Sequence, residues 1–302
     1  MDILDKVNQH FKHTIDNFPI ESVKKLSKKI LECRNNIYCV GVGKSETMSN
    51  NLANLLKSIG IKAFNLNVLN ALHGDIGTLD KNDLVILFSK SGNTKELIEI
   101  IEFIKEKKCI IWGISCEKEC FFREKCDQLI ILPFISELET KIIKTLPTNS
   151  CMSQLIFSNI LTVMIGNMKS LTLDEYRMNH PAGNIGNKLV KIKDVLINNF
   201  PKIEIIKDLR LENVLLEMTK YSIGCCFFSI NNEMVGLLTD GDIRRLLINN
   251  INKKTLELDD LNTNFYYETD IEKLVADIKV IKKKKFIPIL DENKKIIGII
   301  KF

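Results

Sequence analysis

The sequence predicts an α/β fold: a five-stranded parallel sheet flanked by helices, followed by a smaller α+β region. In the N-terminal part of the 302-residue chain, short apolar runs alternate with amphipathic helical patterns. This alternation is typical of parallel strands joined by crossover helices. Past residue 190 the pattern changes to short paired strands flanked by helices, which indicates a second domain.

Five apolar runs are expected to form the sheet, and segments with helical apolar spacing fill the intervals between them. The expected strands are 37–42, 62–66, 84–88, 109–114 and 128–132. The expected helices are 2–17, 20–34, 44–59, 94–107 and 149–168. Helices must cover both faces of such a sheet, because its strands are apolar on both sides.

The C-terminal region contains a tandem repeat of one small module. The first copy is expected to have a helix at 214–220, strands at 224–230 and 234–238, and a helix at 243–248. The second is expected to have a helix at 271–281 and strands at 286–290 and 296–300, and it lacks the last helix of the first. Val235-Gly-Leu-Leu238 corresponds to Ile297-Gly-Ile-Ile300. Residues 187–200 are expected to form a linker helix.

The composition is that of an ordinary globular protein, with 45% hydrophobic residues, 27% charged residues and a net charge of +5. The lysine run 282–285 has no interleaved aromatic residues, which argues against nucleic-acid binding. The N-terminus carries no secretory signal, and no apolar run approaches the ~20 residues of a membrane span. Nine cysteines without a signal favour reduced thiols in a cytoplasmic protein. The spacing of Cys116, Cys120 and Cys126 matches no common zinc pattern, so we predict no metal site there.

The most informative stretch is Ser89-Lys-Ser-Gly-Asn-Thr-Lys-Glu96, which follows an apolar strand and opens a helical pattern. The first N–H groups of a helix lack intrahelical partners, and the helix dipole favours negative charge there. Ser89, Ser91 and Thr94 add hydroxyl donors, and Gly92 lets the backbone approach a ligand closely. Phosphate is therefore the expected ligand. Glu96 is a carboxylate that a phosphate site alone does not need.

A second glycine-rich turn, Gly41-Val-Gly-Lys-Ser45, follows the first expected strand. A Walker-type phosphate loop needs a glycine where this chain has Tyr38, and a dinucleotide fingerprint needs one where it has Glu46. A nucleotidase and a dehydrogenase are therefore not supported. Lys44 can neutralise a phosphate or a developing oxyanion, and the alternative is a solvent-exposed lysine at a helix start.

Further polar residues fall in loops on the expected ligand side of the sheet. For His73, flanked by Gly74 and an aspartate, a functional and a structural role are equally open. Glu137 and Glu139 follow the fifth strand, and either could place a carboxylate at the strand end. His180 precedes a proline that restricts its backbone, and a histidine in such a tight loop is a better functional candidate than one in a helix.

The order and spacing of these motifs resemble those of the arabinose-5-phosphate isomerases, which have a sugar-isomerase (SIS) domain followed by a pair of CBS modules. The matching motifs are Gly41–Ser45, His73–Asp75, Ser89–Thr94, Leu146–Thr148, His180–Gly183 and, at the end of a first CBS module, Gly236–Arg245. The resemblance implies an SIS domain over residues 1–190 and a CBS pair over residues 191–302. The first CBS copy would span about 200–250, and the second, incomplete copy about 258–302.

The resemblance also implies roles for individual residues. Lys44, Glu96, Glu139 and His180 fall on the four polar positions that the family uses in catalysis, Glu139 being placed by counting back eight residues from Pro147 without a gap. Ser45, Ser89, Ser91 and Thr94 fall on the phosphate-binding positions, and His73, Gly60 and Ile61 fall near the bound sugar. Known relatives are tetramers, in which His180 could serve the site of a neighbouring subunit. The reaction needs no redox or organic cofactor, and the CBS pair is a possible nucleotide site.

The chain departs from the family pattern at three places. Asn67 stands where the family often has a histidine able to bind inhibitory zinc, so no metal site is carried over. Thr140–Thr145 replaces small residues and proline, which bears on substrate preference. The second CBS copy lacks its last helix, which leaves open whether the CBS pair binds a ligand.

The expected activity is that of an aldose–ketose isomerase, an intramolecular oxidoreductase that interconverts D-arabinose 5-phosphate and D-ribulose 5-phosphate through an enediolate. The resemblance implies a product used in Kdo biosynthesis, and lipopolysaccharide, capsule and another Kdo-like sugar pathway are the destinations left open. The alternatives are an isomerase of a different phosphosugar and a non-catalytic sugar-phosphate sensor. The four polar positions favour the enzyme, because a sensor needs the hydroxyls but not two carboxylates and a histidine.

Overall fold

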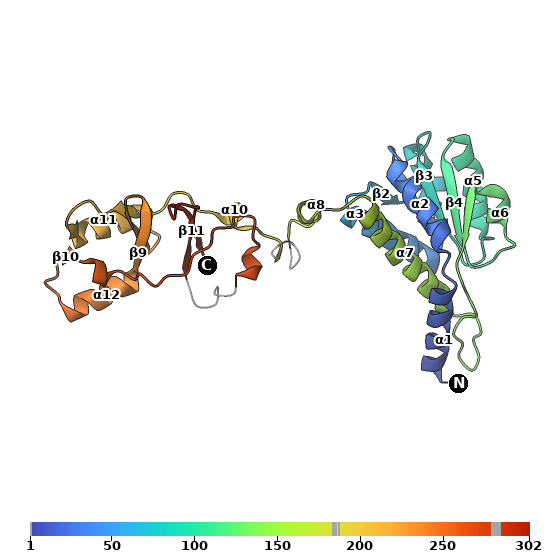
Figure 1. The fold of residues 1–302 in the computed structure, drawn as a ribbon. Coiled ribbons are helices and arrows are strands. Elements are labelled where there is room, and N and C mark those ends of the chain that lie inside the picture. Colours follow the sequence, from blue (N-terminus) through green and yellow to red (C-terminus); the bar gives the residue numbers. More distant parts are fainter. Residues whose placement is uncertain (1, 183–185, 187, 279–284) are drawn as a thin grey trace. The chain divides into compact units, whose positions relative to one another are not determined.

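The computed structural model describes residues 2–182, 186, 188–278 and 285–302, and it contains two compact units (Figure 1). Unit 1 is Met1–Pro181 and unit 2 is Ala182–Phe302. The two units are described separately below.

The core of unit 1 is a five-stranded sheet in which all strands are parallel, as the sequence predicted. The strands lie in the order β2-β1-β3-β4-β5. Their bounds are β1 Ile37–Gly41, β2 Ala63–Asn65, β3 Leu84–Phe88, β4 Ile110–Ser115 and β5 Gln128–Ile131. Gly41 pairs with Phe88, and Phe88 pairs with Ile114, so neighbouring strands end at one edge of the sheet. Ligands of such sheets bind at this carboxyl edge.

Helices cover both faces of this sheet, and each face has its own hydrophobic core. The long helices are α1 Ile3–Asp16, α2 Ile20–Glu32, α3 Lys44–Ser58, α5 Lys95–Glu106 and α7 Asn149–Met168. The shorter ones are α4 Val68–Leu72, the 3-10 turn η1 Asp75–Thr78, α6 Phe121–Lys125 and α8 Leu173–Met178. One core joins α2, α3 and α7 through residues such as Leu26, Leu52 and Phe157. The other joins α4, α5 and α6 through residues such as Val68, Ile100 and Phe122.

Helix α7 is the one helix in the described part of the chain that is long and apolar enough to cross a membrane, with a mean hydropathy of 1.3 over its window. Our expectation that no segment approaches that length therefore needs correction. The helix packs against α1, α2 and α3, and Phe157, Leu161 and Ile165 are fully buried there. Burial accounts for part of its apolar composition, since 39% of this window is buried inside the unit.

Unit 2 contains the expected first repeat as a helix, two antiparallel strands and a second helix. These are α11 Leu211–Tyr221, β8 Cys225–Ile230, β9 Glu233–Thr239 and α12 Asp240–Asn249. β6 Lys202–Glu204 extends that sheet on the β8 side. The second repeat has its strand pair, β11 Phe286–Leu290 and β12 Ile296–Lys301. The minor elements are α10 Ile192–Val195, β7 Leu209–Arg210, β10 Thr255–Leu256, η2 Leu258–Asp260 and η3 Val275–Asp277.

Two helices predicted in unit 2 are wrong over the described residues. Between 187 and 200 the described residues form only short helical segments, because α10 spans four residues and residues 196–200 are not helical. Between 271 and 278 there is only the short η3, and residues 279–281 lie outside the described residues. The amides of Ile192 and Lys193 donate to the carbonyls of Lys273 and Ile271. The Val275 amide donates to the Val190 carbonyl, so the Ile271–Val275 bond that a helix would need is not made. Past α10, Ile197 pairs with Ile299 of β12 instead of continuing that short helix.

Candidate active site

The loop between β3 and α5 is a tight turn whose hydroxyls are held by internal hydrogen bonds. Ser89 is buried, and its Oγ accepts the Gly92 N–H at 2.9 Å and lies 2.8 Å from Thr94 Oγ1. Gly92 has φ +64°, and a Cβ there would lie 2.5 Å from Cys120 Sγ. Ser91 Oγ accepts the Asn93 N–H at 3.2 Å. Only glycine fits at position 92 of this turn. The hydrogen bonds within the turn fix the hydroxyls in place before a ligand arrives.

The start of α5 is open to an anion. Thr94 is the N-cap of this 12-residue helix, yet its side chain makes no cap hydrogen bond to the helix backbone. The first N–H groups of α5 therefore have no side-chain acceptor and point toward the same loop. Together with the three hydroxyls they form a set of donors that suits a phosphate.

The start of α3 lies beside this turn, because β1 and β3 are adjacent and end in register. A Cβ on Gly41 would lie 2.5 Å from the carbonyl oxygen of Ser45, so the helix start approaches the strand end closely. Lys44 is exposed as the first residue of α3, and Ser45 Oγ accepts a hydrogen bond from Nε2 of Gln154 at 3.3 Å. Gln154 lies on α7 and is 1% exposed. The fold thus brings Lys44 and Ser45 to the same edge as Ser89, Ser91 and Thr94.

A cavity of about 260 Å³ opens at this edge. Its walls come from the end of β1, the first turns of α3 and α5, and the segment around α4. The lining residues are Gly41, Val42, Glu46, Asn67, Val68, Leu69, Leu72 and Glu96. Glu46 Oε1 accepts a hydrogen bond from Asn67 Nδ2 at 2.8 Å. His73 is exposed and follows directly after Leu72. The cavity places Glu96 next to the anion-binding turn but outside it.

The two glutamates after β5 have different surroundings. Glu139 lies 2.8 Å from Lys144 and 3.5 Å from Lys6, and the hydrogen bond from Lys144 together with these positive charges lowers its pKa. Glu137 accepts the N–H groups of Thr148 and Ser150 at 2.9 and 3.1 Å, and also the Ser150 hydroxyl. Burial alone would raise the pKa of Glu137, but these hydrogen bonds hold it below its usual value. Glu137 therefore caps α7, and Glu139 is the carboxylate left outside that cap.

Three expected site residues lie elsewhere in unit 1. Gly60 ends α3 with φ +80°, and Ile61 follows it. Asn179 donates to the carbonyl of Ser58 at 3.3 Å, and its neighbour His180 contacts the carbonyl of Tyr176 through Nδ1 at 2.8 Å. This group lies at the opposite end of the 15-residue α3 from Lys44, roughly 22 Å away along the helix axis. One copy of the chain does not bring Gly60, Ile61 and His180 to the cavity.

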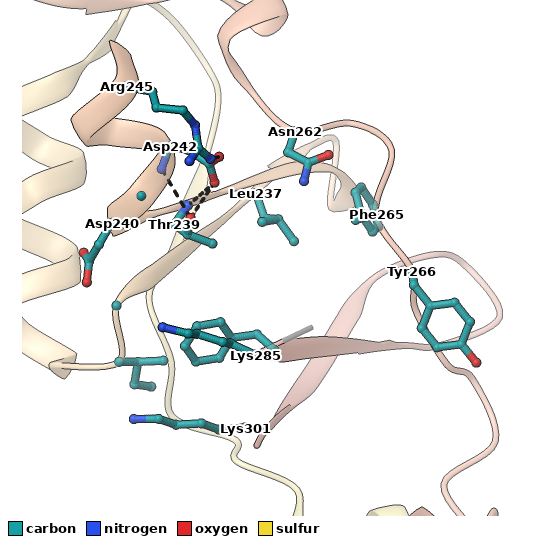
Figure 2. A pocket seen from close by; sticks show the side chains of 14 residues that line it. Leu237, Thr239, Asp240, Asp242, Arg245, Asn262, Phe265, Tyr266, Lys285 and Lys301 are labelled. Carbon is teal, nitrogen blue, oxygen red and sulfur yellow. Dashed lines mark hydrogen bonds and ion pairs between the residues drawn. The ribbon is translucent and has the colours of Figure 1, made fainter. Parts of the chain in front are cut away.

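Unit 2 has a separate cavity of about 700 Å³ (Figure 2). Thr239 and Asp242 form a capping box at the start of α12, and Arg245 pairs with Asp242 at 2.5 Å. Figure 2 shows these three side chains grouped at one side of the cavity. The other lining residues are Ile223, Gly224, Leu237, Asp240, Gly241, Asn262, Phe265, Tyr266, Lys285, Phe286 and Lys301. The combination of aromatic and cationic side chains suits a flat anionic ligand.

Sequence reasoning missed two polar residues at the carboxyl edge, Glu46 and Gln154, and it missed the contact that Asn67 makes there. Glu46 carried a usable signal, since it directly follows the Gly41–Ser45 turn and falls in the first turn of a helix. Gln154 carried none, because it sits within an apolar helix and reaches Ser45 only through tertiary packing. Asn67 was noted as a departure, but its bond to Glu46 joins positions 21 residues apart.

Comparison with known proteins agrees with this geometry. Residues 30–164 match the SIS domain. The chain is 33% identical over 250 residues to an uncharacterised protein of Chlamydia trachomatis, covering 81% of this chain and 74% of that one. It is 26% identical over 251 residues to the arabinose 5-phosphate isomerase KdsD of Yersinia pestis, covering 82% and 76% of the two chains. The structure of an Escherichia coli CFT073 protein in complex with arabinose 5-phosphate matches with a TM-score of 0.53 and 25% identity, covering 60% of this chain and 100% of that one.

Proposed function

The chain belongs to the SIS-domain family, and we propose that it is an aldose–ketose isomerase that interconverts D-arabinose 5-phosphate and D-ribulose 5-phosphate. One observation carries the proposal: the Ser89–Thr94 turn meets the open start of α5 beside a cavity that holds Glu96. The turn and the helix start suit the phosphate, and the cavity with Glu96 suits the sugar. Homology to sugar-phosphate isomerases such as KdsD supports a phosphosugar isomerase, and the relative solved with arabinose 5-phosphate favours a pentose phosphate.

The phosphate would bind at the two helix starts. Ser89, Ser91 and Thr94 with the first N–H groups of α5 would hold its oxygens, and Ser45 would add a hydroxyl from α3. Lys44 would contribute positive charge to the phosphate or to the oxyanion that forms during the reaction. These groups position the substrate without taking part in proton transfer.

The chemistry is a proton transfer between C1 and C2 of the open-chain sugar. A base removes the proton next to the carbonyl, an enediolate forms, and the proton returns to the neighbouring carbon while the hydroxyl proton moves between the two oxygens. We assign the carbon-bound proton to Glu139, and ring opening or hydroxyl proton transfer to His180 and Glu96. Glu139 must leave its ion pair with Lys144 to act, because a carboxylate held by a lysine is a weak base.

A complete site would require a second copy of the chain. His180, Gly60 and Ile61 lie at the far end of α3, so in this proposal a neighbouring subunit supplies them. Exposed apolar side chains on α1 and α7 offer the surface for such contacts, including Leu4, Phe11 and Val163. We propose a homotetramer in the cytoplasm.

Residues 1–190 would then be the SIS domain and residues 191–302 a CBS module pair that regulates or stabilises the assembly. The repeated strand pairs β8–β9 and β11–β12 support this division. The cavity of unit 2, which both lysines (Lys285, Lys301) and aromatic side chains (Phe265, Tyr266) line, supports a nucleotide as its ligand. Isothermal titration with adenine and cytidine nucleotides tests this assignment, and titrations without heat would count against it.

The activity is tested by incubating the purified protein with D-ribulose 5-phosphate and following D-arabinose 5-phosphate by NMR. Conversion by the wild-type protein, and its loss in Lys44→Ala, is the expected result. Turnover of a hexulose or heptulose phosphate instead would assign a different phosphosugar. Saturable binding without conversion of any of these sugars would point to a sensor.

A further inference from the structure

We propose that Glu46 is a specificity-determining residue that binds the hydroxyl groups of the sugar chain, and that Asn67 positions it. The inference rests on the proposed function in one respect, namely that the ligand is a sugar phosphate. It concerns the half of the ligand that the phosphate-binding turn does not contact.

The cavity beside the Ser89–Thr94 turn holds two carboxylates and few donors. A carboxylate at neutral pH only accepts hydrogen bonds. Among the described residues, the bond from Asn67 Nδ2 is the one hydrogen bond or ion pair made by the Glu46 carboxylate, and the Glu96 carboxylate makes none. Three carboxylate oxygens of these two lining residues are therefore without a protein donor among the described residues. A ligand that donates several hydrogen bonds would satisfy them.

The same two carboxylates decide which end of the ligand enters the cavity. A phosphate placed there would face two like charges, whereas the turn nearby offers hydroxyls and free N–H groups. The phosphate is thus directed to the turn and the hydroxyl-bearing chain to the cavity. Apolar walls from Val42, Val68 and Leu72 suit the C–H faces of a sugar. The volume of about 260 Å³ is near the lower end for ligand pockets, which favours a short, unbranched chain.

Asn67 fixes the direction of Glu46. Its Nδ2 donates to Glu46 Oε1 at 2.8 Å, and its Oδ1 accepts the N–H of Asn70 at 3.0 Å as the N-cap of α4. Because both ends of the amide are used, the side chain cannot rotate without losing a bond. The Glu46 oxygen that Asn67 does not bind remains available to the ligand.

This arrangement is less suited to a metal ion than to hydroxyls. The Asn67 oxygen is occupied by Asn70, so two carboxylates are the anionic groups on offer. Among the described residues, no three His, Cys, Asp or Glu side chains gather at one point as metal ligands. Two carboxylates without further ligands hold a divalent cation weakly, since such ions take six or more oxygens.

The test compares the affinities for D-arabinose 5-phosphate and for inorganic phosphate, measured by isothermal titration in EDTA. Glu46→Ala should weaken binding of the sugar phosphate by roughly 10- to 100-fold, because the charged acceptor is lost. Glu46→Gln should weaken it by less, because a neutral acceptor remains. The affinity for inorganic phosphate should stay within about twofold of wild type in both. Glu99→Gln is the matched control, since Glu99 is exposed on the same helix as Glu96 and does not line the cavity.

Asn67→Asp separates positioning from folding. Aspartate keeps the acceptor that caps α4, but it cannot donate to Glu46 and places a like charge against it. We expect weaker sugar-phosphate binding with a fall in melting temperature of no more than about 4 °C, because the cap of α4 is kept. In a Glu46→Gln background the same substitution should have a clearly smaller effect, because Asn67 acts through the Glu46 charge.

Wild-type affinity for the sugar phosphate in Glu46→Ala would overturn the proposal, as would an equal loss of affinity for inorganic phosphate. A Glu46 effect that appears only when divalent cations replace EDTA would overturn it in favour of a cation site. Binding of D-arabinose 5-phosphate without conversion would defeat the proposed reaction alone, and the Glu46 variants would still be decided by their affinities. No binding to the wild-type protein would defeat both.

Discussion

Among the helices that begin at the carboxyl edge of the sheet, α5 and α7 have opposite arrangements in their first turns. At the start of α7, the Glu137 carboxylate accepts the N–H groups of Thr148 and Ser150 and the hydroxyl of Ser150. At the start of α5, the N-cap Thr94 leaves the backbone without a side-chain acceptor. One helix start is closed by the protein itself, and the other is left for an external anion.

The difference separates structural from functional polar groups in a region rich in both. A helix start whose donors are satisfied internally stabilises the fold and has little left for a ligand. A helix start whose N–H donors are held in place but have no acceptor in the protein can donate those hydrogen bonds to an anion. By this criterion Glu137 stabilises α7, whereas the first N–H groups of α5 are free to recognise phosphate. The predictions below test this difference.

The largest expected effect distinguishes the two glutamates after β5. Glu139→Gln should lower kcat by about 10²–10⁴-fold, the range for losing a general base, while Glu137→Gln should leave kcat within a few-fold of wild type. Steady-state kinetics with D-ribulose 5-phosphate give both numbers. Full turnover by Glu139→Gln would show that another group removes the proton.

The next effect comes from closing the open helix start. Thr94→Asp supplies α5 with an internal carboxylate, as Glu137 does for α7. We expect kcat/KM to fall by roughly 10²–10³-fold, because two or so charge-assisted bonds to the phosphate are lost. The melting temperature should stay the same or rise, since aspartate is a good N-cap. Thr94→Ser is the matched control, and it should retain most activity. Unchanged kcat/KM in Thr94→Asp would mean that phosphate does not bind at this helix.

Opening the closed helix start should cost stability. Glu137→Gln keeps the shape of the side chain but loses the charge that caps α7, so unfolding should become easier by about 1–2 kcal/mol. For a unit of this size that corresponds to a fall in melting temperature of roughly 3–8 °C. Calorimetry at neutral pH measures it.

The pH dependence of the stability difference between wild type and Glu137→Gln tests whether the charge of Glu137 causes it. The folded-state pKa of Glu137 is lowered, so its contribution is present above its ordinary value of 4.5 and is lost as the pH falls through the folded value. The stability gap between wild type and Glu137→Gln should therefore narrow in acid below pH 4.5. A gap that stayed constant there would contradict a cap that depends on charge.

The smallest effect concerns His10, a 1% exposed residue of α1 at the start of α7. Its Nε2 lies 3.0 Å from the Asn149 carbonyl and from Ser153 Oγ, and its Nδ1 is buried without a partner among the described residues. Burial lowers the pKa of His10 from its ordinary value of 6.5. The neutral ring therefore stabilises the fold fully above pH 6.5, and this contribution is lost as the pH falls below 6.5.

We expect the wild-type melting temperature to decline between about pH 7.5 and 5.5, on either side of that ordinary value. One proton limits the change in unfolding free energy to about 1.4 kcal/mol per pH unit. His10→Gln can still donate to the Asn149 carbonyl but does not titrate, so its decline over this range should be smaller. Parallel curves for the two proteins would assign the pH dependence to other groups.

The sequence by itself determined the features that depend on neighbours along the chain. The five strands, the long helices and the glycine-hydroxyl turn after β3 follow from local periodicity and turn chemistry, because the signal for each lies within a few residues. The repeat in unit 2 was recognisable for the same reason. The local patterns at 187–200 and 271–278 misled, since residues 274–275 pair with 190–191 and Ile197 pairs with Ile299 of β12 where helices were expected.

Only the tertiary structure decided which polar groups remain available. Glu137 and Glu139 are alike as sequence, and it is the position of the α7 start that engages one and leaves the other to lysines. The contact of Glu46 with Asn67 and that of Gln154 with Ser45 likewise join residues far apart in the chain. Hydrogen-bond satisfaction depends on distances of about 3 Å between such residues, and no pattern of neighbours along the sequence specifies those distances.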